Sequence, residues 1–429
     1  PVGEMIPGMA YLVRRLLENT SNESWLMASS TGKLDTKALL KSPHAIVREQ
    51  GSKADLYLSG PERHQLSPAV EGVGDGKPFH TEPLRDFSFK SVRETYASEI
   101  EAAKVPQIPI DATIDEARKA LDTVESNFEA WRDTDVRTRA KVLTEAARIM
   151  RSRRDELAGV MIKEAGKTWI EADADVCEAI DFCEYYARCV VPLFERKRLG
   201  RFIGELDQTW HQPRGVAAVI SPWNFPLAIC CGMTVAALVC GNTVLVKPAE
   251  QTPGIAALLR DILYEAGCPK GALQFVFGEG ETVGAEIVRD PRVAILAFTG
   301  SKAVGLDIIQ AAGVTPENQA HVKKVVCEMG GKNAVIIDTS ADLDEAVLGV
   351  RHSAFAFQGQ KCSACSRCIV VDPEGPDGPA MRTFIERFVE STRSLVIGEP
   401  IRSGTDVSHV IDNESAAKIR SMIRSAKHE

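Results

Sequence analysis

The fold is decided by residues 215–247, which read GVAAVISPWNFPLAICCGMTVAALVCGNTVLVK. This stretch holds two short apolar runs, Val216–Ile220 and Thr243–Val246, on either side of a segment long enough for a helix. Two more runs follow, Gln274–Phe277 and Ala294–Phe298, each after a segment of helical length. Strands that alternate with helices form a parallel sheet with helices on both faces. The sequence therefore predicts an α/β fold whose ligands bind in the loops after these strands.

Helical patterns fill the chain before this stretch. Apolar residues recur at steps of three and four from Ile114 to Trp131, which is typical of an amphipathic helix. Further helices are predicted at about 136–157 and at 169–190. The alternation of apolar and polar residues in 201–211 predicts a strand.

The composition is that of a soluble globular protein. The chain has 429 residues, of which 44% are hydrophobic and 26% charged, enough for two or three domains. A net charge of −8 gives no reason to expect a nucleic acid partner. The eleven cysteines lie mostly in apolar or helical patterns, which predicts reduced thiols in a cytoplasmic protein. The longest apolar run, Pro226–Cys240, is shorter than the roughly 20 residues that span a bilayer.

Two loops hold candidate catalytic side chains. Asn224 follows the first predicted strand within Ser221–Pro226, where two prolines fix the backbone. Its amide either satisfies a turn, the usual role, or donates to an oxygen that gains charge during a reaction. Glu328 follows a later apolar run and precedes Gly330 and Gly331. It is either a general base or an ordinary loop carboxylate.

Two further loops hold candidate cofactor ligands. Lys247 and Glu250 follow the second predicted strand and are either an ion pair or a donor and an acceptor for ribose hydroxyls. Gly300 and Ser301 follow the fourth and open a helix, whose N-terminus favours phosphate. No G-x-G-x-x-G motif stands there, so the ordinary dinucleotide fingerprint is absent.

Three cysteines stand close together in a turn rich in Gly, Ser and Gln at 358–367. Cys362, Cys365 and Cys368 have a spacing that suits a zinc or iron–sulfur site, or one of them is a nucleophile. No fourth ligand and no Cys/His pair lies nearby at zinc spacing, and Cys368 begins an apolar run. We therefore expect no metal.

Five motifs occur in the order and spacing of the aldehyde dehydrogenase superfamily, which the chain resembles. They are Trp223–Pro226, Lys247–Glu250, Phe298–Ser301, Glu328–Lys332 and Gly359–Cys362. The version of the last motif in this chain is similar to that of the branch that oxidises glutamate-γ-semialdehyde, also called Δ1-pyrroline-5-carboxylate dehydrogenase. The resemblance implies a Rossmann-type parallel sheet with an α/β catalytic domain, and NAD as the cofactor.

The resemblance also implies roles for single residues. Cys362 matches the nucleophile, Asn224 matches the oxyanion donor together with the backbone N–H of Cys362, and Glu328 matches the general base. Lys361, beside the nucleophile, is a candidate substrate residue whose charge favours the thiolate. The cofactor residues implied are Lys247 and Glu250 for the adenosine ribose, Gly300 and Ser301 near the pyrophosphate, and Trp223.

The amino-terminal segment resembles a second enzyme. A helix is predicted at about 9–19, and Tyr11–Asn19 is similar to the last barrel helix of proline dehydrogenase. Arg14 and Arg15 are either a solvated basic pair or a fork that binds a carboxylate. The resemblance implies that Tyr11 and both arginines belong to a proline site. The order of the two pieces is similar to that of the bifunctional proline utilisation A family.

The predicted organisation has four parts. Residues 1–27 are expected to be the last proline dehydrogenase helix and 28–110 an irregular connector that is at most partly ordered. Residues 111–325 are expected to form the NAD-binding domain with a helical start and an oligomerisation strand, and 326–429 an incomplete catalytic domain. The family's later Glu-x-Phe-Gly-Pro motif is absent. We therefore expect a fold truncated at its C-terminus, in a fragment of a longer protein.

The expected function follows from these resemblances. It is NAD-dependent oxidation of glutamate-γ-semialdehyde to glutamate through a Cys362 thioester, the second step of proline catabolism. The parent protein is expected to oxidise proline with FAD, to contact a membrane peripherally through quinone reduction, and to form a homo-oligomer in the cytoplasm. The alternatives are another NAD(P)-dependent semialdehyde dehydrogenase, or a fragment that keeps the fold without activity.

Overall fold

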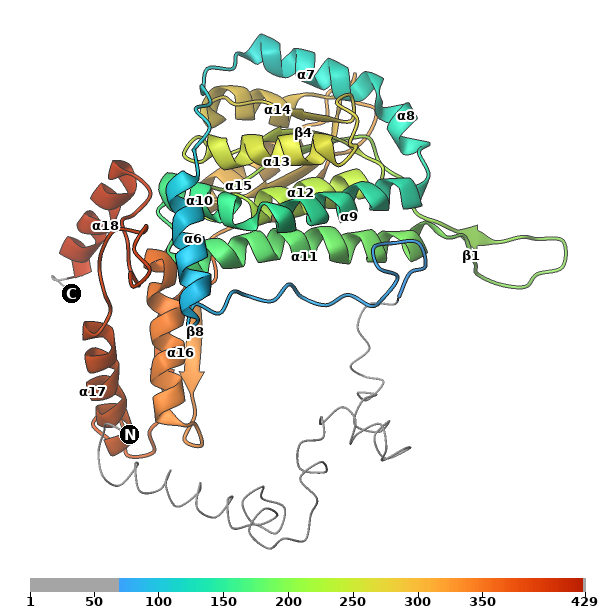
Figure 1. Cartoon of the computed structure of the whole chain (residues 1–429). Coiled ribbons are helices and arrows are strands. Elements are labelled where there is room, and N and C mark those ends of the chain that lie inside the picture. The colour runs from blue at the N-terminus through green and yellow to red at the C-terminus, as the bar shows by residue number, and fades with distance from the viewer. Residues whose placement is uncertain (1–68, 427–429) are drawn as a thin grey trace, which may run out of the picture. The chain divides into compact units, whose positions relative to one another are not determined.

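The computed structural model describes residues 69–426 (Figure 1). The chain divides into two units, 1–66 and 67–429, and the first lies wholly outside the described residues. The predictions for the segment 1–27, including Tyr11, Arg14 and Arg15, lie there too. Among the described residues, no helix is long and apolar enough to cross a membrane.

A five-stranded parallel sheet forms the centre of the described unit. Its order is β5-β4-β3-β6-β7, with every neighbouring pair parallel. The strands are β3 (Val216–Ile220), β4 (Thr243–Lys247), β5 (Leu273–Phe275), β6 (Val293–Thr299) and β7 (Lys324–Glu328). The four predicted strands are confirmed, and β7 is added at one edge. The chain order reverses beside β3, where open α/β sheets bind their ligands.

Alternate residues of each central strand enter opposite cores, which explains the continuous apolar runs. Ala217 and Val219 of β3 belong to one core, while Val216 and Ala218 belong to the other. The first core holds helices α9 (Val136–Ser152), α11 (Trp169–Phe194), α12 (Ala228–Val239) and α13 (Pro253–Glu265). The second holds α7 (Ile114–Ser126), α14 (Ala285–Arg289) and α15 (Lys302–Ala312).

Two predicted helices are each divided in the structure. The pattern from Ile114 to Trp131 forms α7 and a short α8 (Phe128–Arg132), because Asn127 leaves the helical conformation and its amide donates to the Thr123 carbonyl at 2.8 Å. The helix predicted at 136–157 ends at Ser152, and α10 (Arg154–Ala165) follows after Arg153.

The strand predicted at 201–211 is present only at Gln208–Thr209 and is wrong for the rest of that range. The segment instead belongs to a hairpin of two-residue strands, β1 (Lys197–Arg198) and β2 (Gln208–Thr209), which extends beyond α11 (Figure 1). Its apolar residues Phe202, Ile203 and Leu206 are exposed. The alternation misled because none of these side chains contributes to a core in the described part of the chain.

Part of the predicted irregular connector is ordered. Residues 90–102 form α6 (Lys90–Ala102), in which Tyr96 and Ile100 are fully buried. The Tyr96 hydroxyl donates to the Trp169 carbonyl at 3.3 Å. The irregular structure predicted for the connector is therefore wrong for α6, whose two buried positions are too few to give a clear helical pattern.

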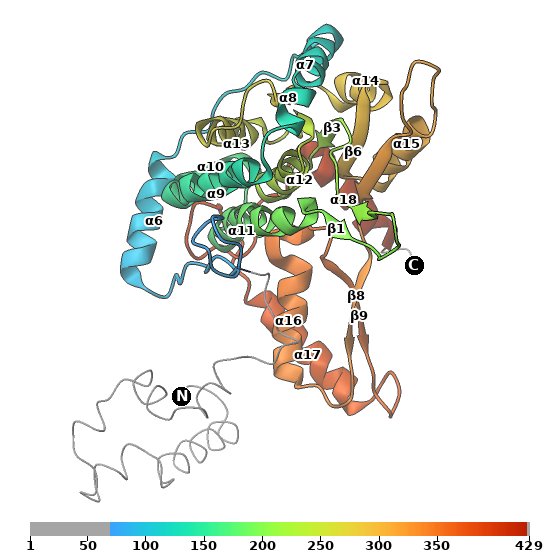
Figure 2. The same ribbon diagram turned by 90° about the vertical axis from the view of Figure 1, so that its right-hand side faces the viewer.

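A smaller sheet follows the central one. Strands β8 (Asn333–Ile337) and β9 (Cys365–Val370) are parallel and lie together with helices α16 (Leu343–Phe355) and α17 (Pro379–Arg393) (Figure 2). Ile337, Val347, Val350 and Phe384 form their core. The last described helix is α18 (Asn413–Ala426). The predicted domain boundary at 325 falls within β7.

Candidate active site

The loop that carries Asn224 is bonded to the loop that carries Cys362. Asn224 Nδ2 donates to the Gln360 carbonyl at 3.0 Å, and Asn224 Oδ1 accepts from the Phe225 N–H at 3.1 Å. These two bonds fix the orientation of the Asn224 amide, and they join it to Gln360, two residues before Cys362. Since a primary amide has two N–H donors, this geometry leaves one for another acceptor.

The loop that carries Glu328 lies against the same segment. Glu328 ends β7 with an exposed side chain, and the loop continues to Asn333, whose Nδ2 donates to the Cys362 carbonyl at 2.7 Å. At Gly331 a Cβ would lie only 2.8 Å from that carbonyl. The structure thus brings together the loops of the three predicted catalytic residues.

Cys362 differs from the buried cysteines in its exposure. Burial raises the pKa of Cys177, Cys230 and Cys268 to about 12, so these thiols are inert at neutral pH. Cys362 is exposed and free. Cys365 is half-buried at the start of β9, and its Sγ contacts the Arg367 carbonyl at 3.2 Å.

The metal interpretation gains nothing from the structure. Cys368 lies on β9 and is largely exposed. Its partial burial and, to a smaller extent, the neighbouring Cys365 raise the pKa of its thiol. Within residues 69–426, no three His, Cys, Asp or Glu side chains are grouped so that they could hold a metal ion.

Lys361 is paired with a carboxylate. Its Nζ donates to Glu171 Oε1 at 2.7 Å and lies 2.6 Å from Oε2. Glu171 stands in the first turn of α11 and is buried. The positive charge beside Cys362 is therefore compensated, which weakens the expected effect of Lys361 on the thiol.

The turn that leads to Cys362 has an unusual backbone. Phe357, Gln358 and Gly359 have φ values of 50°, 58° and 70°. The left-handed region costs an L-residue about 1–2 kcal/mol, so the turn must be held by its surroundings. Gln358 Nε2 donates to the His409 carbonyl at 2.6 Å, and Gln360 Oε1 accepts from the Ile411 N–H at 2.9 Å.

One face of α11 points acidic side chains at these loops. Glu171, Asp175 and Glu178 follow at steps of four and three, so they share a helix face. Burial raises the pKa of Asp175 and of Glu178. Asp175 pairs with Lys167 at 3.1 Å. No role for these residues is predicted from the sequence, although their helical spacing among apolar positions is a signal for buried acidic side chains.

Lys247 and Glu250 form an ion pair at the carboxyl end of β4. Lys247 is buried, and Glu250 Oε1 also accepts from the Gly280 N–H at 2.7 Å. Burial raises the pKa of Glu250, but Lys247 outweighs it, and the pKa is lowered. Gly280 opens a π-helical turn, and a Cβ there would lie 3.4 Å from Glu250 Oε1. The two side chains thus form an ion pair beside a glycine turn, and the same donor and acceptor remain the candidates for ribose hydroxyls.

In the loop after β6, Gly300 and Ser301 each have a structural role. A Cβ at Gly300 would lie 2.5 Å from the Phe298 ring, so glycine is needed for packing. Ser301 is the N-cap of α15, and its hydroxyl accepts from the Val304 N–H at 3.3 Å. Trp223 lies edge-to-face with Phe357, their ring centroids 6.5 Å apart.

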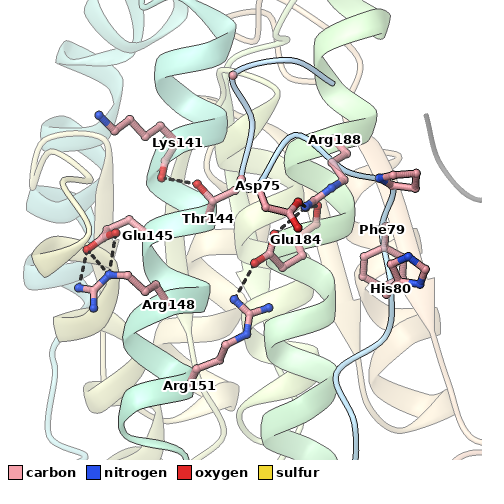
Figure 3. Close-up of a pocket in the computed structure, with 13 residues that line it drawn as sticks. Asp75, Phe79, His80, Lys141, Thr144, Glu145, Arg148, Arg151, Glu184 and Arg188 are labelled. Atoms are coloured by element: carbon pink, nitrogen blue, oxygen red, sulfur yellow. Dashed lines mark hydrogen bonds and ion pairs between the residues drawn. The ribbon is translucent and has the colours of Figure 1, made fainter. Parts of the chain in front are cut away.

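A cavity of about 620 Å³ lies elsewhere, between residues 72–80 and helices α9 and α11 (Figure 3). It is lined by charged side chains that neutralise one another. Arg188 lies 3.0 Å from Asp75 and 2.5 Å from Glu184, which also binds Arg151 at 2.7 Å. None of the predicted site residues lines this cavity.

Two family models match the chain. The model of the aldehyde dehydrogenase family matches residues 95–429, and that of proline dehydrogenase matches residues 1–28. Both resemblances predicted from the sequence are confirmed.

Curated relatives share the longer match. The 1-pyrroline-5-carboxylate dehydrogenase of Geobacillus thermodenitrificans is 44% identical over 313 residues, which are 73% of this chain and 60% of that protein. That of Anoxybacillus flavithermus is 43% identical over 318 residues, 74% of this chain and 61% of that protein. The chain thus spans about 60% of the length of the curated relatives it matches.

Solved structures agree. Proline utilisation A from Bdellovibrio bacteriovorus, inactivated by N-propargylglycine, is 40% identical with a TM-score of 0.81 and covers 100% of this chain and 46% of its own. A 1-pyrroline-5-carboxylate dehydrogenase from Thermus with bound NAD is 35% identical with a TM-score of 0.77, over 82% of this chain and 73% of its own. By its sequence motifs, its fold and these matches, the chain belongs to the aldehyde dehydrogenase family.

Proposed function

We propose that the complete protein oxidises L-glutamate-γ-semialdehyde to L-glutamate with NAD. The observation that carries the proposal is the bond between Asn224 Nδ2 and the Gln360 carbonyl, which aligns a fixed amide with the Cys362 loop. The names of the curated relatives support the choice of substrate.

Cys362 is the proposed nucleophile. Its thiolate forms a C–S bond to the aldehyde carbon, and the carbonyl oxygen becomes an oxyanion. The second N–H of Asn224 and the backbone N–H of Cys362 are the proposed donors to that oxyanion. One such donor typically contributes about 10²–10³ in rate.

The residues at the carboxyl ends of β4 and β6 fit the adenosine half of NAD. Lys247 and Glu250 offer a donor and an acceptor for ribose hydroxyls, and the Glu250 side chain is 35% exposed beside the glycine turn. The helix that Ser301 caps presents its N-terminus to the same edge of the sheet. A bound NAD would supply the acceptor for the hydride that leaves the substrate carbon.

Glu328 is the proposed general base for release of the acid. It takes a proton from a water whose oxygen attacks the thioester; the C–S bond breaks and the Cys362 thiolate leaves. The exposed position of its side chain at the end of β7 supports this role, because a water molecule can reach the carboxylate.

The wider organisation is proposed on the same basis. We assign the proline dehydrogenase helix to 1–27, a connector to 28–110, the NAD-binding domain to 111–325 and the catalytic domain to 326–429, with β7 favouring a boundary after 328. The match to proline dehydrogenase supports proline oxidation with FAD in the complete protein. We also propose a homo-oligomer, supported by the exposed apolar hairpin, in the cytoplasm with peripheral membrane contact.

The test is a pair of cysteine variants in the complete protein. With glutamate semialdehyde and NAD, Cys362→Ala is expected to abolish NADH formation, measured by absorbance, because it removes the sulfur that forms the thioester. Cys365→Ala is the matched control and is expected to retain activity. Activity in Cys362→Ala would contradict the assignment, and faster turnover of succinate semialdehyde by the unchanged enzyme would contradict the substrate.

A further inference from the structure

A buried lysine lies behind the proposed site. Lys167 stands in the loop between α10 and α11 and is fully buried. Its Nζ is 3.1 Å from Asp175 Oδ2, which is also fully buried. Neither atom has an aligned hydrogen bond in the part of the chain that the structure describes. Burying two charges costs several kcal/mol per ion before their attraction is counted, so the pair is poorly explained by stability alone.

Two aromatic rings enclose the Lys167 ammonium. Its Nζ lies 4.3 Å from the centroid of the Phe225 ring and 4.3 Å from that of the Phe357 ring. A cation–π contact is strongest where the cation is removed from water, as Lys167 is here. Phe225 directly follows Asn224, and Phe357 is the first residue of the left-handed turn before Cys362. One cation thus contacts both proposed catalytic loops.

The carboxylate partner contacts a third element. Asp175 Oδ1 accepts from the Ala228 N–H at 2.6 Å, at the start of α12 and two residues after Pro226. The Asn224 loop is therefore held at its end by Asp175 and in its middle by Lys167.

We propose that Lys167 is a positioning residue for the reaction proposed above, on which this inference rests. Its ammonium holds the rings of Phe225 and Phe357 at a fixed separation. This separation keeps the Asn224 amide bonded to Gln360 and in line with Cys362. Lys167 itself touches neither substrate nor cofactor.

Backbone strain supports this role. Phe357 and Gln358 occupy the left-handed region, which is unfavourable for L-residues and persists only where the surroundings hold it. Phe357 is fully buried, and the Lys167 ammonium lies over its ring. Without the charge, the turn is expected to relax and to move Gln360 away from Asn224.

The test replaces the charge while keeping the length of the side chain. In the complete protein, Lys167→Met is expected to lower kcat for semialdehyde oxidation roughly 10- to 100-fold, at a temperature well below its own melting point, with KM for NAD unchanged. Lys167→Arg, which restores a cation between the rings, is expected to recover most of the loss. The variant with both Lys167→Met and Asn224→Ala is expected to be no slower than Asn224→Ala alone, because both act on the same donor.

Lys163→Met is the matched control. Lys163 lies one turn earlier on α10, and its Nζ donates to the carbonyls of Glu101 and Ala103 at 3.0 and 2.6 Å. This variant loses structural bonds remote from the site, so its melting point is expected to fall while kcat holds. An unchanged kcat in folded Lys167→Met, or independent effects of Lys167 and Asn224, would overturn the inference.

A second measurement separates this inference from the proposed function. The rate at which iodoacetamide alkylates Cys362 depends on the turn and not on the substrate. It is expected to change at least about threefold in Lys167→Met and not in Lys163→Met. If the unchanged protein fails to oxidise the semialdehyde, the proposed function falls, and this rate alone decides the inference. If Lys167→Met does not fold, Phe357→Leu takes its place, with the same expected loss and the same contradicting result.

Discussion

The ammonium of Lys323 is buried against two carbonyl groups rather than a carboxylate. Its Nζ donates to the Val288 and Asp290 carbonyls, at 2.6 Å each, at the C-terminal end of α14. The Asp290 carboxylate is bonded instead to Arg292 at 2.6 Å. Burial lowers the pKa of Lys323 to about 8, although Asp290 opposes this. A neutral amine is thus easier to bury here than an ammonium.

This residue predicts a pH dependence of stability. Because the pKa is lower in the folded state than its usual 10.5, folding releases the proton between about pH 8 and 10.5, and stability rises with pH across that window. Below about pH 8 the ammonium is charged in both states, and the full cost of burying it, about 3 kcal/mol, lowers the free energy of unfolding. Lys323→Met should remove this part of the dependence. The free energy of unfolding in urea, compared for both proteins at pH 7.5 and 9.5, checks it; parallel changes would contradict it.

Single residues of the site were predictable to different degrees. Asn224, Glu328 and Cys362 stand in motifs that can be read along the chain, and the structure brings their loops together. Lys167 and Asp175 could not be placed, because a helix period does not say which loops a helix face meets. The charge compensation of Lys361 by a residue 190 positions away was hidden for the same reason.

Elements were predicted where burial decides them. Strands β3, β4 and β6 carry apolar residues on both faces, and this pattern survives in a single sequence. The break at Arg153 has no glycine or proline to mark it, so α9 and α10 looked continuous. The hairpin at 197–209 has an apolar alternation that faces solvent, and pattern alone cannot tell a core from an interface.

The hairpin yields a prediction about assembly. Phe202, Ile203 and Leu206 are exposed over a short, weakly paired ribbon, and such apolar surface typically marks a protein contact. Ile203→Asp is expected to shift the complete protein to a smaller assembly, because it places a charge in the contact. Sedimentation velocity measures this. Glu205→Gln is the control, because it changes the charge of a neighbouring residue that is already polar and exposed, and it should leave the assembly unchanged. Equal behaviour of both variants would contradict the prediction.

At the scale of the whole molecule, two activities are expected on one chain. The proline dehydrogenase match covers residues 1–28 and the aldehyde dehydrogenase match covers 95–429, so the matched residues do not overlap. Arg14→Ala or Arg15→Ala in the complete protein is expected to weaken proline oxidation and to spare semialdehyde oxidation. Separate assays with a dye acceptor and with NAD check this. A parallel loss of both activities would show that the two sites are not independent.

The segment 69–89 has a practical consequence for engineering. It brings Glu82 and Arg85 onto the first core's helices: Glu82 binds Arg151 at 2.8 Å, and the Arg85 backbone N–H donates to Asp173 at 2.9 Å. Asp173 in turn holds the buried Arg154 at 2.7 Å. A shortened gene that starts near 111, just before α7, would omit this segment and α6, and would leave their apolar and charged contacts exposed to solvent. Recombinant versions of the dehydrogenase part should therefore begin at or before residue 69, so that they do not aggregate during purification.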